Sequence, residues 1–232
     1  MPIMRIPLTK YGLPQVAAFP AMLLAVMVTV YIAGLNAIMS PTAVTIVEVI
    51  MAVLLIWVLA FFRDPQREIP EGGNILVSPA DGRVTDIEAV EANDVIKGKA
   101  LRIGIFLDIF SVHINRMPCA VRIDKVTYKP GRYTNAMNPA SGLVNESNDI
   151  AMTRLTEPKD ALFVRQISGA IARRIVCKAV VGGDFACGER FGMIKFGSRT
   201  ELYVPARDDV KCVAKVGDKV KAGETILAEY SM

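Results

Sequence analysis

Two long uncharged stretches near the N-terminus constrain the fold of this chain more than any other feature. From Tyr11 to Val47 the sequence contains no Asp, Glu, Lys or Arg, and the segment Val49–Phe62 is uncharged as well. A helix needs about 20 apolar residues to cross the hydrocarbon core of a bilayer. Gln15–Leu35 and Ala43–Phe62 reach this length, so we expect two transmembrane helices.

The segments that flank these stretches predict how the helices are oriented. The linker 36–42 is short and uncharged, which favours a tight turn between antiparallel helices. Arg5 and Lys10 precede the first stretch, and Arg63 and Arg67 follow the second. Because Lys and Arg concentrate on the cytoplasmic side, we expect both ends there. Two consecutive spans fit a cleaved signal peptide poorly. The sequence therefore predicts an anchor, residues 1–62, in the cell (inner) membrane, with the remaining chain in the cytoplasm.

Charge and cysteine usage exclude several classes of function. The chain has 27 basic and 23 acidic residues, and nearly all of them lie beyond the predicted anchor. This balance gives no reason to expect a nucleic-acid partner. The four cysteines show neither a Cys-x-x-Cys pair nor zinc-ligand spacing, and there is one histidine. We therefore expect reduced, mostly buried thiols and no metal site.

From Arg63 onward, short apolar runs alternate with Gly, Pro, Asn and Asp. This texture predicts a compact, mainly β domain over residues 63–232. A short helix fits one place, residues 167–175. Nucleotide binding has no support, because no Gly-x-Gly-x-x-Gly or Walker-type loop occurs. The predicted strands are 75–77, 83–87, 101–106, 121–128, 161–167, 174–181, 193–196 and 201–204.

A Gly-Ser pair separates the last two of these strands. Gly197 permits backbone conformations that are closed to other residues, and its carbonyl can be approached closely. The hydroxyl of Ser198 can then attack this carbonyl in an N-to-O acyl shift. Elimination of the resulting ester leaves a dehydroalanine, which hydrolyses to a pyruvoyl group. In isolation, however, a Gly-Ser pair indicates no more than an ordinary turn.

Four ordered motifs resemble the phosphatidylserine decarboxylases, and they are closest to the pyruvoyl-dependent short bacterial and archaeal branch. The resemblance runs from about Arg63 to the C-terminus and implies a barrel-sandwich-like β catalytic domain. The motifs are Phe62-Arg63-Asp64-Pro65, Ser78-Pro79-Ala80-Asp81-Gly82, Val112-His113-Ile114-Asn115-Arg116-Met117-Pro118 and Phe196-Gly197-Ser198-Arg199.

This resemblance implies self-cleavage between Gly197 and Ser198. Residues 1–197 would become a β chain and residues 198–232 an α chain, which form a heterodimer; whether a higher oligomer exists is left open. Ser198 would become the covalent pyruvoyl cofactor. That group would form a Schiff base with the amine of phosphatidylserine in the membrane and stabilise the carbanion left by loss of CO2. The product would be phosphatidylethanolamine.

The same resemblance implies catalytic roles for His113 and Asp81. His113 is the only imidazole available to deliver a proton to the substrate carbon. Asp81 resembles the family's essential aspartate and would orient His113 or activate Ser198. The plainer alternatives are a structural histidine and an Asp-Gly hairpin turn. Longer relatives have a second histidine where this chain has Arg116, so a relay built on that histidine is in doubt here.

Two other functions fit parts of the sequence. A decarboxylase of archaetidylserine would meet the same serine headgroup. Val216–Ala228 is similar to the turn-and-strand pattern of biotinyl and lipoyl carrier domains, which would make the chain a non-catalytic, membrane-tethered carrier module. Such carriers display a modified lysine flanked by methionines, and no Met-Lys-Met occurs in this chain.

Overall fold

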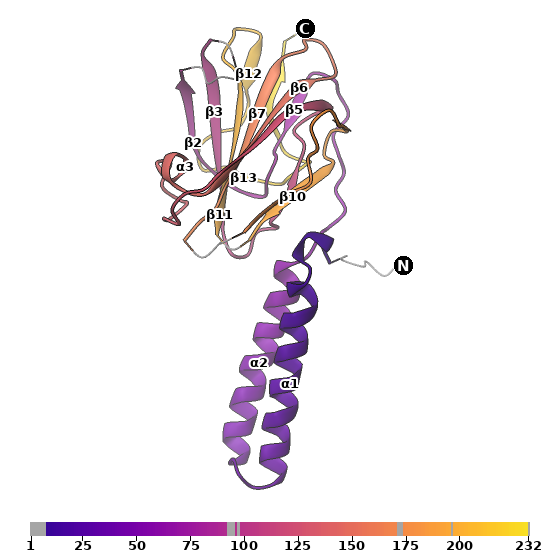
Figure 1. Ribbon diagram of the computed structural model, residues 1–232, viewed down its shortest axis with the longest axis vertical. Helices are drawn as coiled ribbons and strands as arrows, with labels where there is room; N and C mark the ends of the chain where they lie inside the picture. The colour runs from indigo at the N-terminus through magenta and orange to yellow at the C-terminus, as the bar shows by residue number, and fades with distance from the viewer. Residues whose placement is uncertain (1–7, 92–95, 97, 171–173, 196, 232) are drawn as a thin grey trace. The chain divides into compact units, whose positions relative to one another are not determined.

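The computed structural model describes residues 8–91, 96, 98–170, 174–195 and 197–231. The chain divides into two compact units, and the boundary lies between Pro65 and Gln66. The first unit is helical and the second is mainly β, as the ribbon in Figure 1 shows. The predicted fold class, two apolar N-terminal helices followed by a mainly β remainder, is confirmed.

Two long apolar helices make up most of the first unit. Helix α1 spans Gln15–Leu35 and helix α2 spans Pro41–Phe61, each with 21 residues. A 3-10 helix, Lys10–Gly12, precedes them. The side chain of Ser40 caps α2 by accepting a hydrogen bond from the amide of Ala43. With a proline at its start, where no amide hydrogen is needed, α2 begins slightly earlier than the apolar pattern indicated.

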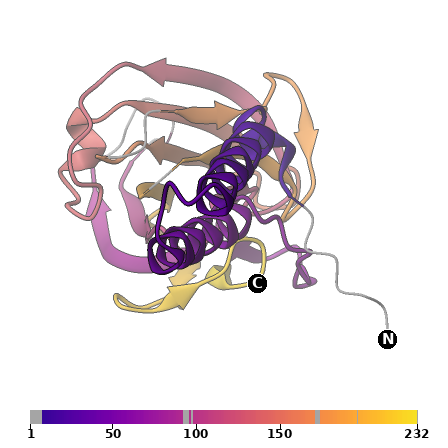
Figure 2. The ribbon, with the colours of Figure 1, turned by 90° about the horizontal axis from the view of Figure 1, so that it is seen from below.

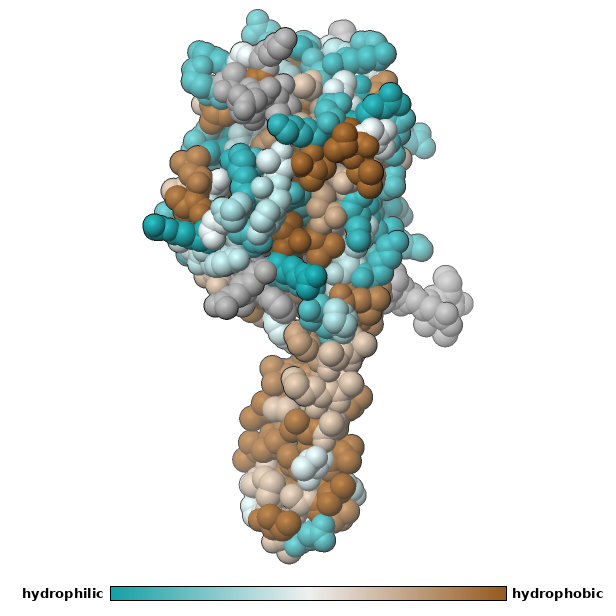
Figure 3. Space-filling model, in the orientation of Figure 1, coloured by the Kyte–Doolittle hydropathy of each residue, from teal (hydrophilic) through white to brown (hydrophobic). Residues whose placement is uncertain are grey.

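Both helices have the length and the hydropathy of membrane-spanning segments. No residue of α1 is buried, and α2 buries only Val58 and Phe61. The surface of this unit is hydrophobic over most of its area (Figure 3). At the open end of the hairpin, Thr9 N donates to Phe62 O at 2.9 Å, so the entering and leaving segments lie side by side. Such an apolar surface is stable when lipid rather than water covers it.

In its described residues, the second unit contains three antiparallel sheets. The large sheet has the strand order β13-β2-β3-β11-β7-β6-β5-β9, and the smaller ones are β1-β14-β12 and β4-β10-β8. Figure 2 shows the large sheet curling. A short helix, α3 (Ser141–Val144), lies between β5 and β6. The strands are β1 (Ile75–Val77), β2 (Gly82–Val90), β3 (Ala100–Leu107), β4 (Ile114–Arg116), β5 (Val121–Lys129), β6 (Ser147–Arg154), β7 (Ala161–Ile167), β8 (Ile175–Cys177), β9 (Asp184–Phe185), β10 (Arg190–Ile194), β11 (Ser198–Pro205), β12 (Val210–Cys212), β13 (Lys219–Val220) and β14 (Ile226–Tyr230).

The main core of this unit is apolar and draws on all three sheets. Its members include Leu76 in β1, Phe191 in β10 and Leu202 in β11. Strand β11 is buried along its whole length. Side chains alternate along a strand, so Ser198 and Thr200 share the core face with Leu202, and the residues between them face the opposite side.

Most predicted strands are present, with shifts at their ends. The predictions for 75–77 and 161–167 match β1 and β7, and the segment 201–204 is the middle of the longer β11. The segment 174–181 is reduced to β8. The prediction for 193–196 corresponds to β10, which ends at Ile194, while Phe196 lies outside the described residues.

Several short strands and the long strand β6 were missed, and one predicted helix is wrong. Strand β6 was missed because its first half, Ser-Asn-Asp, is polar; there Asp149 is bound by Arg165 of the neighbouring strand at 2.7 and 2.9 Å. The helix suggested for 167–175 is not found in its described part, because residues 168–170 and 174 are irregular and both ends belong to strands. Residues 171–173 lie outside the described part.

The cysteine prediction holds in one respect and fails in another. All four cysteines are free thiols, but only Cys119 is buried. Cys177 and Cys212 lie in the short edge strands β8 and β12, and Cys187 lies in the turn before β10; all three are half-buried. Burial raises the pKa of the Cys119 thiol to about 12, which makes it unreactive at neutral pH.

Candidate active site

Ser198 is the first residue of β11 and is fully buried. Gly197, directly before it, has φ +58°, a left-handed conformation that favours glycine. Among the residues that the structure describes, the Oγ atom of Ser198 has no hydrogen-bond partner. Leaving a buried polar atom without a partner costs about 1–3 kcal/mol, so such an atom calls for an explanation.

The carbonyl of Gly197 packs tightly against the backbone at Gly169. Strand β11 pairs with β7 so that Arg199 is opposite Ile167. Extending this antiparallel register by two residues places Gly169 beside Gly197. A Cβ atom at position 169 would overlap the carbonyl oxygen of Gly197. Glycine is therefore required there, and the position of the carbonyl is fixed. Gly169 could not be singled out from the sequence, because the contact depends on the strand register.

A cavity of about 250 Å³ opens beside this junction. It is lined by Phe106, Asp108 and Ile109 at the end of β3, by Asn135 and Ala136, and by Ala170 and Gly197. Gly197, the first residue of the Gly197–Ser198 bond, thus borders a space that can admit a small polar group.

His113 lies directly before β4 and is fully buried. Its Nδ1 is 2.8 Å from the carbonyl oxygen of Ser111. A carbonyl only accepts, so Nδ1 carries the hydrogen and donates it. In the neutral ring, Nε2 is then the nitrogen that can take up a proton and release it.

Two contacts bring His113 and Ser198 into the same region. The main chain of His113 accepts a hydrogen bond from Ile194 N at 3.3 Å, and Ser198 follows shortly after Ile194. In addition, Asn115 donates from Nδ2 to Thr200 Oγ1 at 3.1 Å. Asn115 lies two positions beyond His113, and Thr200 lies two positions beyond Ser198 on the same face of β11.

Asn115 is also the centre of a buried polar network on the side of β11 where Ser198 lies. Its Oδ1 accepts from Gln166 Nε2 at 2.8 Å, and Gln166 Oε1 accepts from Asn148 Nδ2 at 3.1 Å. Its Nδ2 also donates to Pro79 O at 3.3 Å. Satisfied polar networks of this kind make a core rigid and unique. Sequence reasoning did not single out Asn115, although it lies inside one of the recognised motifs.

Asp81 lies in a different neighbourhood from Ser198. Its Oδ2 accepts from Arg67 at 2.7 Å, and its Oδ1 accepts from Ala222 N at 2.8 Å. It ends the turn before β2, and β3 separates β2 from β11. The two backbones are thus about two strand spacings apart, roughly 9–10 Å. Arg67, predicted as a flank of the anchor, has a structural role here and a nearly buried side chain.

Arg116 takes the place of the second histidine of longer relatives, and it binds the main chain. Its Nη1 donates to Gly188 O at 3.0 Å. A Cβ atom at Gly223 would lie 3.0 Å from Arg116 Cδ, so the C-terminal segment packs closely against this side chain. The guanidinium therefore connects the loop before β10 with the C-terminal segment.

Behind Ser198, on the opposite face of β11, Arg199 forms a buried ionic network. It donates to Asp86 at 2.6 and 2.9 Å, to Thr85 Oγ1 at 2.6 Å and to Glu201 at 2.8 Å. Burial alone would raise the pKa of Asp86, but hydrogen bonds from Thr85 and Arg199 and the nearby arginine charges lower it below its usual value. The network holds Arg199, the residue directly after Ser198.

Lys195 is a titratable residue near Ser198 that was not singled out from the sequence. It is buried three residues before Ser198. Burial, and then the charge of Arg174, lower the pKa of this amine below its usual value. Only the position of Lys195 near the Gly-Ser pair could have drawn attention to it.

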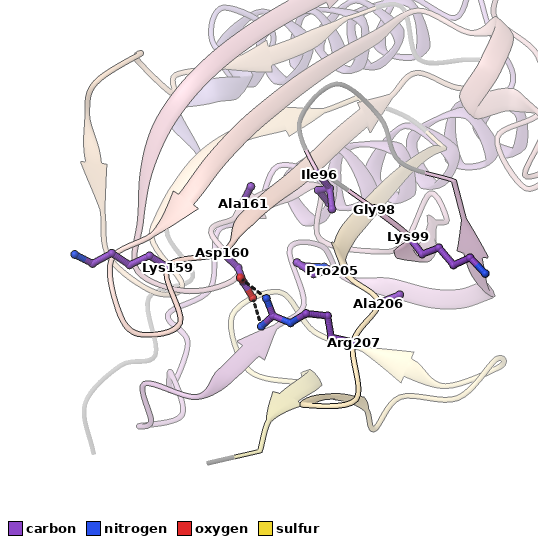
Figure 4. Close-up of a pocket in the computed structure, with 9 residues that line it drawn as sticks. All are labelled: Ile96, Gly98, Lys99, Lys159, Asp160, Ala161, Pro205, Ala206 and Arg207. Atoms are coloured by element: carbon purple, nitrogen blue, oxygen red, sulfur yellow. Dashed lines mark hydrogen bonds and ion pairs between the residues drawn. The ribbon is translucent and has the colours of Figure 1, made fainter.

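A larger cavity, of about 430 Å³, lies elsewhere (Figure 4). Pro205, at the far end of β11 from Ser198, lines it together with Arg207 and Asp160. Arg207 is held by two hydrogen bonds to Asp160, at 2.8 and 2.9 Å. None of the predicted site residues lines this cavity, so we do not assign the chemistry to it.

Comparisons with known proteins decide the family. A profile of the phosphatidylserine decarboxylase family matches residues 54–228. A phosphatidylserine decarboxylase proenzyme of Rhodopirellula baltica is 46% identical over 182 residues, which cover 78% of this chain and 74% of the relative. The chain belongs to the phosphatidylserine decarboxylase family.

A second relative gives the same result. A phosphatidylserine decarboxylase proenzyme of Desulfotalea psychrophila is 45% identical over 171 residues, or 74% of this chain and 78% of the relative. The predicted family and enzyme class are thus confirmed. The region matched to the phosphatidylserine decarboxylase profile includes Asp81, His113, Gly197 and Ser198. Both relatives are named proenzymes, which describes those proteins as precursors that are processed.

Proposed function

We propose that this chain converts phosphatidylserine to phosphatidylethanolamine and CO2, with a pyruvoyl cofactor made from its own Ser198. The main support is the geometry of the junction. A buried serine hydroxyl with no partner in the described chain follows a left-handed glycine whose carbonyl is fixed by Gly169. The buried Ser141 Oγ also has no partner there, but it follows Ala140 and lacks this arrangement.

Self-cleavage then follows from the residues at the junction. Ser198 Oγ bonds to the carbonyl carbon of Gly197, the C–N bond breaks, and the amine of Ser198 takes a proton. Elimination across Cα and Cβ of Ser198 releases the carboxylate of Gly197. Addition of water and loss of ammonia complete the new N-terminus. Because the carbonyl is held in place, the attack requires little reorganisation of the backbone.

The space at Ser198 suits the resulting group. A pyruvoyl group has fewer heavy atoms than the serine residue it replaces, so it fits without repacking. The 250 Å³ cavity at Gly197 provides an approach for the headgroup. When present, the group supplies a ketone next to an amide carbonyl, which withdraws electrons from a substrate carbon that has lost CO2.

His113 is proposed as the proton donor. Its Nδ1–H is engaged by Ser111 O at 2.8 Å, which fixes the ring and leaves Nε2 as the nitrogen for transfer. Asp81 is proposed to act at the same site through its turn. Pro79 O of that turn accepts from both Asn115 and Arg116 of β4, the strand that directly follows His113.

The two products of cleavage are proposed to remain one heterodimer. Strand β11, at the start of the α chain, lies between β3 and β7 of the β chain. Strand β14 likewise pairs with β1, and β13 pairs with β2. Breaking one peptide bond leaves these ladders intact, so the chains separate only when the unit unfolds.

The helical unit is proposed as an anchor in the cell membrane, with the β-rich unit in the cytoplasm. Its two apolar helices and its basic flank at Lys10 and Arg63 support this orientation. A membrane location suits the chemistry, because the acyl chains of the substrate stay in the bilayer while its serine headgroup lies at the interface.

Substitution of single serines tests the proposed function. Ser198→Ala should remain one chain and release no CO2 from phosphatidylserine, since it lacks the attacking oxygen. Ser141→Ala is the matched control, because it removes another buried hydroxyl, and it should mature and react normally. The measurements are the cleaved fraction by mass spectrometry and the CO2 released. Activity in Ser198→Ala would refute the proposal.

A further inference from the structure

A stiff apolar turn connects β3 to β4. At its tip Phe110 is 67% exposed and Ile109 is 37% exposed. The carboxylate of Asp108 accepts hydrogen bonds from Phe110 N at 2.8 Å, Ser111 N at 2.9 Å and Ser111 Oγ at 3.1 Å. The turn is therefore ordered before any partner arrives. Holding two apolar side chains exposed to water is unfavourable unless a partner covers them.

This turn forms one side of the cavity at the Gly197–Ser198 junction. Ile109 lines the cavity on that side, and Asn135 and Ala136 line it from the loop before α3. The residue after Ala136, Met137, is 55% exposed. Apolar side chains thus border the entrance to the proposed active site from two separate loops.

Basic residues adjoin the same turn on its other side. A second cavity, of about 330 Å³, is lined by Phe110 together with Arg83, Lys219 and Lys221. All three basic residues are exposed. Arg83 donates to Gly217 O at 2.6 Å, and Lys221 lies 3.4 Å from Glu224.

The acidic residues of this second cavity are already engaged by the protein. Asp81 is bound by Arg67, and Asp108 is bound by its own turn. Arg83 and Lys219 therefore present positive charge to solvent beside Phe110, and Lys221 is exposed next to its partner Glu224. Apolar side chains next to Lys and Arg are the combination with which proteins contact the surface of an anionic bilayer.

We propose that Ile109, Phe110 and Met137, with Lys219 and Lys221, form a lipid-contact surface that places the active-site cavity on an anionic membrane. This surface belongs to the β-rich unit and is additional to the two apolar helices. The inference rests on the proposed function, because it takes the substrate to be a lipid that enters the Gly197 cavity directly from the bilayer.

Fluorescence quenching tests the contact without relying on activity. Trp57 is the only tryptophan, so a Trp57→Phe background makes a new tryptophan the sole reporter. Phe110→Trp in the full chain, reconstituted in vesicles with brominated anionic lipid, should be quenched. Val180→Trp is the matched control, since Val180 is also 67% exposed but lies in the turn after β8; it should stay unquenched. Equal quenching at both positions would overturn the proposed lipid-contact surface. An absence of quenching at position 110 would overturn it as well, and this is the result expected if a second copy of the chain covers the turn.

A kinetic comparison tests the delivery of substrate. Phe110→Ser should raise KM several-fold for phosphatidylserine in vesicles and leave turnover of a water-soluble short-chain phosphatidylserine unchanged. Lys219→Gln should weaken the dependence of the rate on anionic lipid content. Equal effects on both substrates would contradict a lipid-contact role. If the unmodified protein decarboxylates neither substrate, the proposed function fails, while quenching still decides whether the surface contacts lipid.

Discussion

Ser198 and Arg199 face opposite sides of β11, and each side has its own environment. Ser198 lies toward the apolar core with His113 nearby, whereas Arg199 is held by Asp86 and Glu201 behind the sheet. A buried arginine held by several acceptors permits little movement of its backbone. Ser198, the proposed reactive residue, is thus fixed by a neighbour that has no part in the proposed chemistry.

At the scale of residues, substitutions of His113 and of Asp81 should separate self-cleavage from decarboxylation. His113→Ala should mature but lose most of its turnover, since no other imidazole can deliver the proton. Asp81→Ala should impair self-cleavage more than turnover, because it removes a partner of Arg67 and Ala222 N and loosens the turn beside β4. The measurements are the cleaved fraction and the CO2 released per cleaved molecule. Normal turnover in His113→Ala would make the imidazole structural.

Arg199→Met should destabilise the folded protein by about 3–5 kcal/mol, because it leaves Asp86 buried without its main partner. The lowered pKa of Asp86 means that this pair stabilises the fold above the carboxyl's ordinary pKa of 3.8, and that the effect fades as the pH falls toward the folded pKa. The gap in unfolding free energy between Arg199→Met and the unmodified protein should therefore narrow below pH 3.8. A gap that is constant with pH in denaturant titrations would contradict the role of this ion pair.

At the scale of elements, the segment after β7 fixes the bond that is proposed to break. Gly169→Ala should slow self-cleavage strongly, because the new methyl group displaces the Gly197 carbonyl. Gly73→Ala is the control, since a Cβ atom there meets only ordinary contacts with Thr156. Cleavage is followed by the appearance of the small fragment over time. Equal rates in the two variants would show that the carbonyl position is unimportant.

The sequence predicted the elements whose signals are local. The apolar helices, the turn at Asp81 and the Gly197–Ser198 pair were all found in this way. It could not predict the contact of Arg199 with Asp86, which joins residues 113 positions apart, or that of Asn115 with Thr200, which joins residues 85 apart. Such contacts depend on strand order and register, which the pattern of one strand does not encode. Strand β6 was missed for a related reason, because its polar residues are satisfied by neighbouring strands.

At the scale of the whole molecule, one chain contains a helical unit, proposed as the anchor, and a β-rich unit, proposed as the catalytic part. Reporter fusions at Lys10 and Arg67 should both be cytoplasmic, because α1 and α2 form a hairpin whose two ends lie together. A fusion in the linker at Ile38 should face the other side. Lys10 and Arg67 on opposite sides of the membrane would rule out the hairpin.

The intact mass of the purified protein tests the central claim most directly. The account predicts two fragments, of 197 and 35 residues, from the chain of 232. The smaller should be lighter, by one molecule of ammonia, than a fragment that begins with an unmodified Ser198. A single uncleaved chain in active protein, or a small fragment that keeps its serine amine, would contradict the account.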